Sequence, residues 1–320
     1  MSEDGDRVAG QRGIARGGDE VGEGREAPPG FWCSRHRGRL YALLVPAPVD
    51  PLVPLAPGVY AWFAPSHGHG HTNAGVIVDD DGATVVDTLM VASQWEPFAG
   101  AVEALGRPVP RTVLTSSHVE FAGGTRRFRM SGVYGTRQAS ALLDQPANVE
   151  VFRRLFPEFA PQFGDDFGTR AVTHMVTESA YLTPAVMLVT TGGQMLENLV
   201  AVVPGADLVF AGALCSFGVV PAAFDGDPAG WADALDQVVE LAPIVVPGHG
   251  PIGGEEEVRE LQAYLRACVV AEGDPSRVES GPWDSWPGQE WTVVNVERAA
   301  MLAAGDPSPP PTLLTRLGLP

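Results

Sequence analysis

The chain has 320 residues, 45% of them hydrophobic and 19% charged, and its formal net charge at pH 7 is −18. A surface this acidic repels phosphate backbones, so we expect no nucleic acid as a partner. The 21 basic residues are all arginines, and a chain without lysine cannot form the Schiff base of a pyridoxal enzyme or supply the lysine of a P-loop nucleotidase.

The apolar runs, the N-terminal segment and the cysteine spacing indicate the cellular compartment and the state of the thiols. No run of about 18 apolar residues is present, so we expect neither a membrane span nor a membrane partner. The first ten residues, MSEDGDRVAG, lack the basic and apolar segments of a secretory signal, which favours a cytoplasmic location. Cys33, Cys215 and Cys268 are far apart and odd in number, so they indicate neither a disulfide framework nor a CxxC zinc site. The oligomeric state cannot be read from the sequence.

The first half of the chain begins with a polar segment and then alternates strands and helices. Residues 1–30, rich in Gly, Asp, Glu and Arg without periodicity, are expected to be a disordered tail. Apolar runs and turn residues predict strands at 59–63, 74–78, 83–86 and 111–114. Helical spacing predicts helices at 94–105, 140–143 and 149–156. Ser93 is the expected N-cap of the first of these helices.

The second half repeats this style. Strands are predicted at 185–190, 199–203, 208–211 and 244–246, and helices at 231–241, 255–270 and 294–304. Runs of strands interspersed with helices indicate two sheets packed together with helices outside. We expect one domain over residues 31–305 with a C-terminal helical extension. The proline-rich stretch 307–311 is expected to end the ordered part, which leaves 306–320 as a tail.

The most informative segment is TSSHVEFAGG at residues 115–124, which follows a strand-like run and precedes a helix-like run. In this context it resembles the T-H-x-H-x-D-H-x-x-G loop of the metallo-β-lactamase superfamily. The four positions that carry metal ligands in that family read Ser116, His118, Glu120 and Phe121 here. One histidine is kept, one carboxylate is lengthened and two imidazoles are replaced.

Four further segments resemble the same family in the same order. They are NAGVIV at 73–78, TVVDT at 84–88, ADLVFAGA at 206–213 and IVVPGHG at 244–250. In addition, FDGDPAGWADAL at 224–235 resembles the segment before the last histidine in bacterial hydrolase-like members. The resemblance implies a four-layer αβ/βα sandwich of metallo-β-lactamase type. It also implies an active site along one edge, where the strand-end loops meet.

The resemblance identifies which ligands are replaced. The family holds two zinc ions, but the place of a third histidine is taken by Gln194 and that of the bridging aspartate by Ala213. These two residues, together with Ser116 and Phe121, offer no strong donor to zinc, so we expect no dinuclear site. Asp87 supports the site from behind in the family, and we expect the same role here. His118, Glu120 and His249 remain.

Three more histidines form HGHGH at His67, His69 and His71, in a loop that borders the active cleft of the resembled fold. If this segment is extended, its alternation puts all three imidazoles on one side. They then serve either as replacement ligands or as acid–base groups. The alternative is a mobile loop without a role, because short histidine-rich tracts are a weak compositional signal.

The sequence therefore predicts an enzyme that acts on a small, fairly apolar metabolite by acid–base chemistry, without dinuclear zinc and without another cofactor. The reaction is that of a lyase, dehydratase, cyclase or ester, thioester or lactone hydrolase, and fold-level analogy favours specialised metabolism. The expected catalytic residues are His118, Glu120 and His249. The expected substrate-binding or accessory residues are His67, His69, His71, Ser116, Phe121, Gln194 and Asp87.

Two alternatives stay open. In the first, the chain is a mononuclear zinc or iron hydrolase whose metal is held by His118, Glu120 and His249, since two histidines and a carboxylate suit either ion. In the second, the site has lost its chemistry and the fold is a non-catalytic binding or scaffold module.

Overall fold

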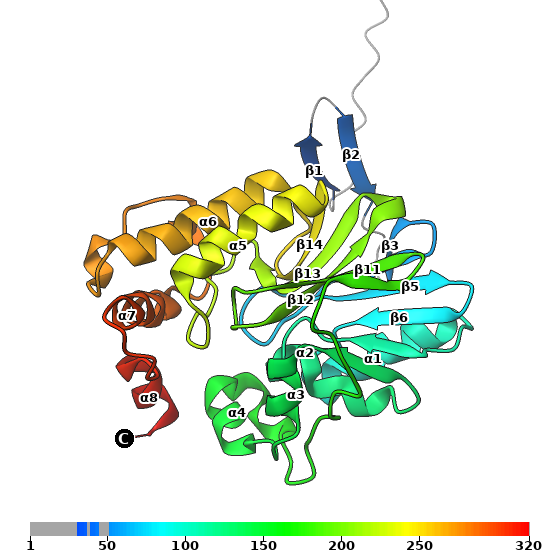
Figure 1. Ribbon diagram of the computed structural model, residues 1–320, viewed down its shortest axis with the longest axis horizontal. Coiled ribbons are helices and arrows are strands. Elements are labelled where there is room, and N and C mark those ends of the chain that lie inside the picture. Colours follow the sequence, from blue (N-terminus) through cyan, green and yellow to red (C-terminus); the bar gives the residue numbers. More distant parts are fainter. Residues whose placement is uncertain (1–30, 37–38, 45–50, 320) are drawn as a thin grey trace, which may run out of the picture. The chain divides into compact units, whose positions relative to one another are not determined.

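The computed structural model describes residues 31–36, 39–44 and 51–319, with side chains from residue 51 onward. The predicted disordered tail at 1–30 lies outside this part. The chain divides into two units, Met1–Val45 and Pro46–Pro320. In the first unit, strands β1 (Phe31–His36) and β2 (Arg39–Leu44) form an antiparallel hairpin. The remaining elements belong to the second unit (Figure 1).

The second unit contains two sheets. The first sheet has seven strands in the order β3 (Val53–Ala56), β4 (Val59–Trp62), β5 (Ala74–Asp79), β6 (Gly82–Val86), β7 (Arg111–Val113), β8 (Gly132–Gly135) and β9 (His174–Met175). The second has five, β10 (Ala180–Thr183), β11 (Val186–Thr191), β12 (Asn198–Val203), β13 (Leu208–Ser216) and β14 (Ile244–His249). Pairs from β3 to β6 and from β10 to β13 are antiparallel, whereas β6 to β9 and β13 with β14 are parallel.

The α-helices are α1 (Ala92–Ala104), α2 (Val119–Ala122), α3 (Arg137–Leu143), α4 (Val149–Leu155), α5 (Pro228–Leu241), α6 (Glu255–Val270), α7 (Thr292–Ala303) and α8 (Pro311–Leu317). Short 3₁₀ turns are η1 (Gly123–Arg127), η2 (Pro157–Gln162), η3 (Pro204–Ala206), η4 (Pro275–Arg277), η5 (Pro282–Ser285) and η6 (Gln289–Trp291). None of the helices within the described ranges is long and apolar enough to cross a membrane.

The buried side chains form three successive layers of core. Phe98 and Val102 of α1 pack on the outer face of the first sheet, against strands β5 and β6. Side chains of β4 to β7 meet those of β11 to β14 in the space between the sheets, where Phe210 is buried. Helices α5 and α6 cover the outer face of the second sheet through Trp231 and Leu261 (Figure 1). The predicted four-layer αβ/βα sandwich is therefore confirmed.

Most predicted elements are present within a few residues of their expected ends, but two predictions about boundaries are wrong. Ser93 is not the N-cap of α1, because the helix begins at Ala92 after Val91. The Gln94 carboxamide supplies the cap instead, accepting hydrogen bonds from the backbone N–H groups of Met90 and Val91 at 3.2 and 3.3 Å. The other error is at the C-terminus.

The ordered chain does not end at the proline-rich stretch, because α8 follows it. Leu313 and Leu317 are buried in the core cluster that α5 to α7 form. The carbonyl of Leu317 also accepts a hydrogen bond from the Arg154 guanidinium of α4 at 2.6 Å. Apolar burial by these two leucines thus overrides the breaking effect of the prolines, and Pro311 becomes the first residue of the helix.

One glycine shows how closely the two sheets pack. A Cβ on Gly75 of β5 would lie 2.5 Å from the ring of Phe210 on β13. Gly100, on the exposed face of α1, has open space at the corresponding position.

We predict that Gly75→Ala destabilises the protein by about 1–3 kcal/mol, because the added methyl forces the sheets apart or the ring off its rotamer. Gly100→Ala is the matched control and should stabilise by about 0.5–1 kcal/mol through helix propensity alone. Denaturant unfolding of both variants measures this. Equal stabilities would contradict the packing described.

Candidate active site

The site lies where β6 and β7 end, and a buried carboxyl group fixes it there. Asp87, in left-handed conformation at φ 61°, follows β6 directly. It accepts hydrogen bonds from the backbone N–H of Thr115 at 2.8 Å and from its hydroxyl at 2.7 Å. Burial raises the pKa of Asp87 to about 7, although both hydrogen bonds act in the opposite direction. Asp87 therefore stands behind the 115–124 loop and anchors its first residue.

Glu120, on α2, is the centre of one cluster. Its Oε1 accepts hydrogen bonds from the backbone N–H of Gly70 at 2.5 Å and from Nε2 of His249 at 3.2 Å. Burial alone raises the pKa of Glu120, but the hydrogen bond and charge of His249, the charge of His69 and the Gly70 N–H lower it to about 2. Glu120 is consequently a carboxylate at any ordinary pH, with its charge compensated by neighbours rather than by water.

His249 ends β14 and is held by the turn that follows. The Asn73 side chain donates to the carbonyls of Pro247 and Gly250 at 2.9 and 2.8 Å, which fixes that turn against β5. The ring of Phe121 meets the His249 ring edge to face, with centroids 5.7 Å apart. Phe121 is buried. It thus forms an apolar support for His249 where the resembled family has a ligand.

The HGHGH loop does not present its three histidines together. His71 N–H donates to the Gly68 carbonyl, and Gly68 and Gly70 have φ of 146° and 85°, so the segment turns rather than running extended. Only His69 reaches the Glu120 cluster, with its ring 5.9 Å from that of His249. The prediction that all three imidazoles lie on one side is wrong, because these glycines fold the loop.

The other two histidines face elsewhere. The ring of His71 is shared between Ser66 and Glu158, at 2.9 and 3.1 Å. His67 is exposed. His69 is turned inward, and its Nε2 lies 3.0 Å from the Val220 carbonyl. Burial lowers the pKa of His69 to about 4, so His69 is neutral at neutral pH and donates this hydrogen bond.

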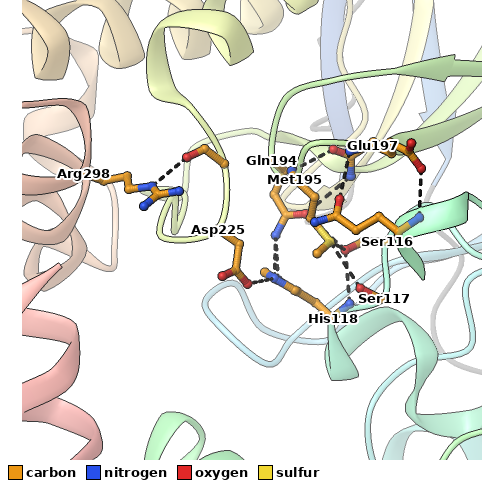
Figure 2. Close-up of polar contacts among 11 residues, drawn as sticks. Ser116, Ser117, His118, Gln194, Met195, Glu197, Asp225 and Arg298 are labelled. Carbon is orange, nitrogen blue, oxygen red and sulfur yellow. Dashed lines mark hydrogen bonds and ion pairs between the residues drawn. The ribbon is translucent and has the colours of Figure 1, made fainter. Parts of the chain in front are cut away.

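His118 belongs to a second cluster (Figure 2). Its Nε2 lies 2.8 Å from Oδ2 of Asp225, and its Nδ1 lies 2.6 Å from Nε2 of Gln194. Its ring stacks on Phe224, with centroids 5.2 Å apart and an interplanar angle of 9°. Both ring nitrogens therefore form hydrogen bonds with side chains of the loops after β11 and β13.

The tautomer of His118 follows from the orientation of two amides. Asn198 accepts from the Met195 N–H and donates to the Thr115 carbonyl, so its amide nitrogen also points at Oε1 of Gln194, at 3.4 Å. That oxygen accepts from the Ser116 hydroxyl as well, at 3.1 Å. Gln194 must then donate its amide N–H to Nδ1 of His118, which leaves the His118 proton on Nε2, directed at Asp225.

Asp225 and Gln194 act in opposite directions on the protonation of His118. Burial lowers the pKa of His118, but the hydrogen bond and charge of Asp225, with the charge of Glu120, outweigh it and raise the pKa above its ordinary value. Burial likewise raises the pKa of Asp225, whereas His118 and the charge of Arg298 lower it. Protonation at Nδ1 requires the Gln194 amide to turn over, so His118 takes up a second proton only with movement of Gln194.

Both clusters border one cavity of about 290 Å³, close to the lower end of the roughly 300–1,000 Å³ range of ligand pockets. Its polar lining is made of His69, Ser117, His118, Glu120, Gln145, Asn148, Thr169 and Asp225. The rest is mainly apolar and comes from α3, α4 and the C-terminal part of the chain: Leu142, Leu143, Pro146, Ala147, Val151, Phe152, Leu155, Phe156, Ala222, Phe224 and Trp291. The arrangement suits a small, largely apolar ligand with one polar end.

The structure thus divides the sequence-predicted residues between two clusters. Glu120 and His249 come together and are joined by His69, whereas His118 is paired with Gln194 and Ser116. Sequence reasoning missed Asp225 as the partner of His118. Asp225 lies in the FDGDPAGW segment, whose resemblance to the family assigns this residue no role. Trp291, which lines the cavity, carried no motif.

The donor set does not fit a metal held by His118, Glu120 and His249. The two nitrogens of His118 are engaged by Asp225 and Gln194, and Oε1 of Glu120 is engaged by His249. Within residues 51–319, no group of three or more histidine, cysteine, aspartate or glutamate side chains is arranged to hold a metal ion. Ala213, at the place of the bridging aspartate, has no side-chain donor for a metal. Its backbone N–H donates to the Thr115 hydroxyl at 3.1 Å.

No family model and no curated protein matches the chain, but many solved structures do. DIM-1 metallo-β-lactamase is 16% identical with a TM-score of 0.53, covering 67% of this chain and 96% of its own. FIM-1 from Pseudomonas aeruginosa, solved in a mono-zinc form, is 20% identical with a TM-score of 0.52, covering 67% and 94%. A metallo-β-lactamase from Pontibacter korlensis is 20% identical with a TM-score of 0.53, covering 67% and 98%. The chain therefore has the metallo-β-lactamase fold.

Proposed function

We propose that the chain is an enzyme that transfers a proton to and from a small, largely apolar molecule, with His118 and Asp225 as the acid–base pair. The observation that carries the proposal is the 2.8 Å contact between these two side chains at the polar end of an otherwise apolar cavity. Histidine beside a carboxylate in such surroundings is the usual equipment for general acid–base catalysis.

Asp225 is the group that accepts the proton from the ligand. Its Oδ2 is bonded to His118, while no hydrogen bond from residues 51–319 reaches its Oδ1, and 48% of its side chain is exposed. His118 is only 14% exposed and has no open nitrogen. A proton removed from a ligand is therefore accepted at Oδ1 of Asp225, while the Nε2–H of His118 stays hydrogen-bonded to Oδ2.

Glu120 and His249 have different parts in this proposal. Glu120 lines the cavity as a fixed negative charge. His249 does not line the cavity and acts as a positioning residue, because its Nε2–H holds Oε1 of Glu120. Ser116 and Gln194 are also positioning residues, because they hold the backbone and the ring of His118 through hydrogen bonds.

The proposed reaction classes are those that the sequence predicts: a lyase, dehydratase, cyclase, or an ester, thioester or lactone hydrolase. Each of these reactions moves a proton at a carbon or an oxygen, so none needs a metal hydroxide in principle. A role in specialised metabolism is part of the proposal by analogy of fold only. The two competing functions are a single-metal hydrolase and a non-catalytic binding module.

The proton-transfer proposal predicts hydrogen exchange at acidic C–H groups. The protein is incubated in D₂O with a panel of alkyl ketones and acyl thioesters, and deuterium uptake is followed by mass spectrometry. Asp225→Asn and His118→Gln should each lower the exchange rate by about 10²-fold, the usual worth of a positioned acid–base group. Asp233→Asn removes the same charge from an exposed site on α5 and should leave the rate unchanged. Equal rates in all four proteins would show that this pair is not the acid–base group.

The single-metal alternative is tested by elemental analysis of the purified protein. We predict less than about 0.1 equivalent of zinc or iron, because the candidate ligands are already engaged with one another. A nearly stoichiometric metal content that is lost in His118→Ala would favour the metal-dependent hydrolase instead.

The Glu120 cluster predicts a pH-dependent difference in stability. His69 is neutral in the folded protein down to about pH 4, whereas in the unfolded chain it takes up a proton near its ordinary value of 6.5. Protons therefore bind preferentially to the unfolded state between these values. As the pH falls from 6.5 to about 4, the free energy of unfolding should fall by up to about 3 kcal/mol relative to His69→Gln.

Chemical denaturation of both proteins across this pH range provides the measurement. A constant difference between wild type and His69→Gln would contradict the buried, neutral state of His69.

A further inference from the structure

We infer that the cavity takes a hydrophobic cation, a protonated amine carried on an apolar body. This inference rests on the proposed function of the same site and adds the chemical class of its ligand. Two carboxylates, an aromatic wall and the charge of the remaining lining support it.

The first carboxylate is Glu120, which is buried yet keeps one oxygen open. Its two donors, Gly70 N–H and His249 Nε2, both reach Oε1 and not Oε2. No fully buried side-chain nitrogen or oxygen in residues 51–319 lacks a hydrogen-bond partner, so Oε2 is not sealed in the interior. Glu120 lines the cavity and its side chain is only 8% exposed. Oε2 therefore faces the space that a ligand enters.

The second carboxylate is Asp225, which also lines the cavity. His118 occupies its Oδ2, which orients the carboxylate and leaves Oδ1 for the ligand (Figure 2). An ammonium group has three N–H donors and no acceptor, so it matches a pair of open carboxylate oxygens better than a neutral hydroxyl does. Hydrogen bonds between ionised partners are also about twice as strong as neutral ones.

The aromatic wall of the cavity suits a cation as well. Phe152, Phe156, Phe224 and Trp291 line it, and the last two rings lie 5.8 Å apart. The Trp291 ring already contacts the guanidinium of Arg316 at 4.9 Å and the His69 ring at 4.8 Å, so a ligand cation meets chiefly the phenylalanine rings. Faces of tryptophan and phenylalanine attract cations through their quadrupoles, and this attraction grows as the cation loses water.

Apart from the two histidines, the remaining polar lining is neutral and consists of Ser117, Gln145, Asn148 and Thr169. None of the cavity-lining residues in the described structure is an arginine, and the chain has no lysine. Of the two lining histidines, His69 donates to Val220 and His118 donates to Asp225. A net charge of −18 further favours approach of cations over anions. A carboxylate-bearing ligand would add a third carboxylate to a cavity that Glu120 and Asp225 already line.

Binding of three probes that share a phenylbutyl group tests the inference: phenylbutylammonium, phenylbutanol and phenylpentanoate. Calorimetric titration of the wild-type protein should rank the ammonium about tenfold tighter than the alcohol, with the carboxylate weakest. Asp225→Asn and Glu120→Gln should each reduce the ammonium affinity by about fivefold to tenfold and change the alcohol affinity by less than about twofold. Asp233→Asn, with the same loss of charge outside the cavity, should bind all three like the wild type.

The inference is overturned if phenylpentanoate binds as tightly as phenylbutylammonium, if none of the probes binds, or if both cavity variants keep the wild-type preference. Because the comparison among probes uses unmodified protein, it stands even where Glu120→Gln fails to fold. Binding is measured without turnover, so it separates the two proposals. Ammonium preference without hydrogen exchange would disprove the enzyme function alone, and exchange without ammonium preference would disprove this inference alone.

Discussion

The site depends on a buried hydrogen-bond junction at Thr115, where the two sheets meet at one edge. Its hydroxyl donates to Asp87 after β6 and accepts from Ala213 N–H in β13, while its carbonyl accepts from Asn198 and from Leu199 N–H at β12. Because the junction is sealed from water, each of these groups would be costly to leave without a partner. The loop that carries His118 and Glu120 thus starts from a point fixed by both sheets.

From this junction, the replaced ligand positions form a consistent alternative set. Ser116 and Gln194 do not leave a vacant place beside His118; they hold its imidazole in one tautomer toward Asp225. Phe121 packs under His249, which holds Glu120. Substitutions that are separate in the sequence thus become mutual partners in the fold, and this supports a hydrogen-bonded acid–base site over a damaged metal site.

Sequence patterns predicted the sandwich well, because long apolar runs, tight turns and five ordered motifs all agreed. They failed where tertiary contacts decide the outcome. The helix α8 follows a proline-rich stretch only because Leu313 and Leu317 are buried, and the glycines of HGHGH fold a segment that alternation alone would extend. In the site, sequence reasoning missed Asp225 and did not predict how His118, Glu120 and His249 pair. Asp225 is 107 residues from His118, and no local pattern encodes that contact.

The central claim is that the His118 ring is held by hydrogen bonds to Gln194 and Asp225 rather than by a metal ion. Long-range ¹H–¹⁵N correlation spectra of the histidine rings test it most directly, with assignment by His118→Gln and with zinc absent and present. The account predicts a neutral His118 protonated on Nε2 at high pH, with ring nitrogen shifts that one equivalent of zinc leaves unchanged. A proton on Nδ1, or a zinc-dependent shift of either His118 nitrogen, would contradict it.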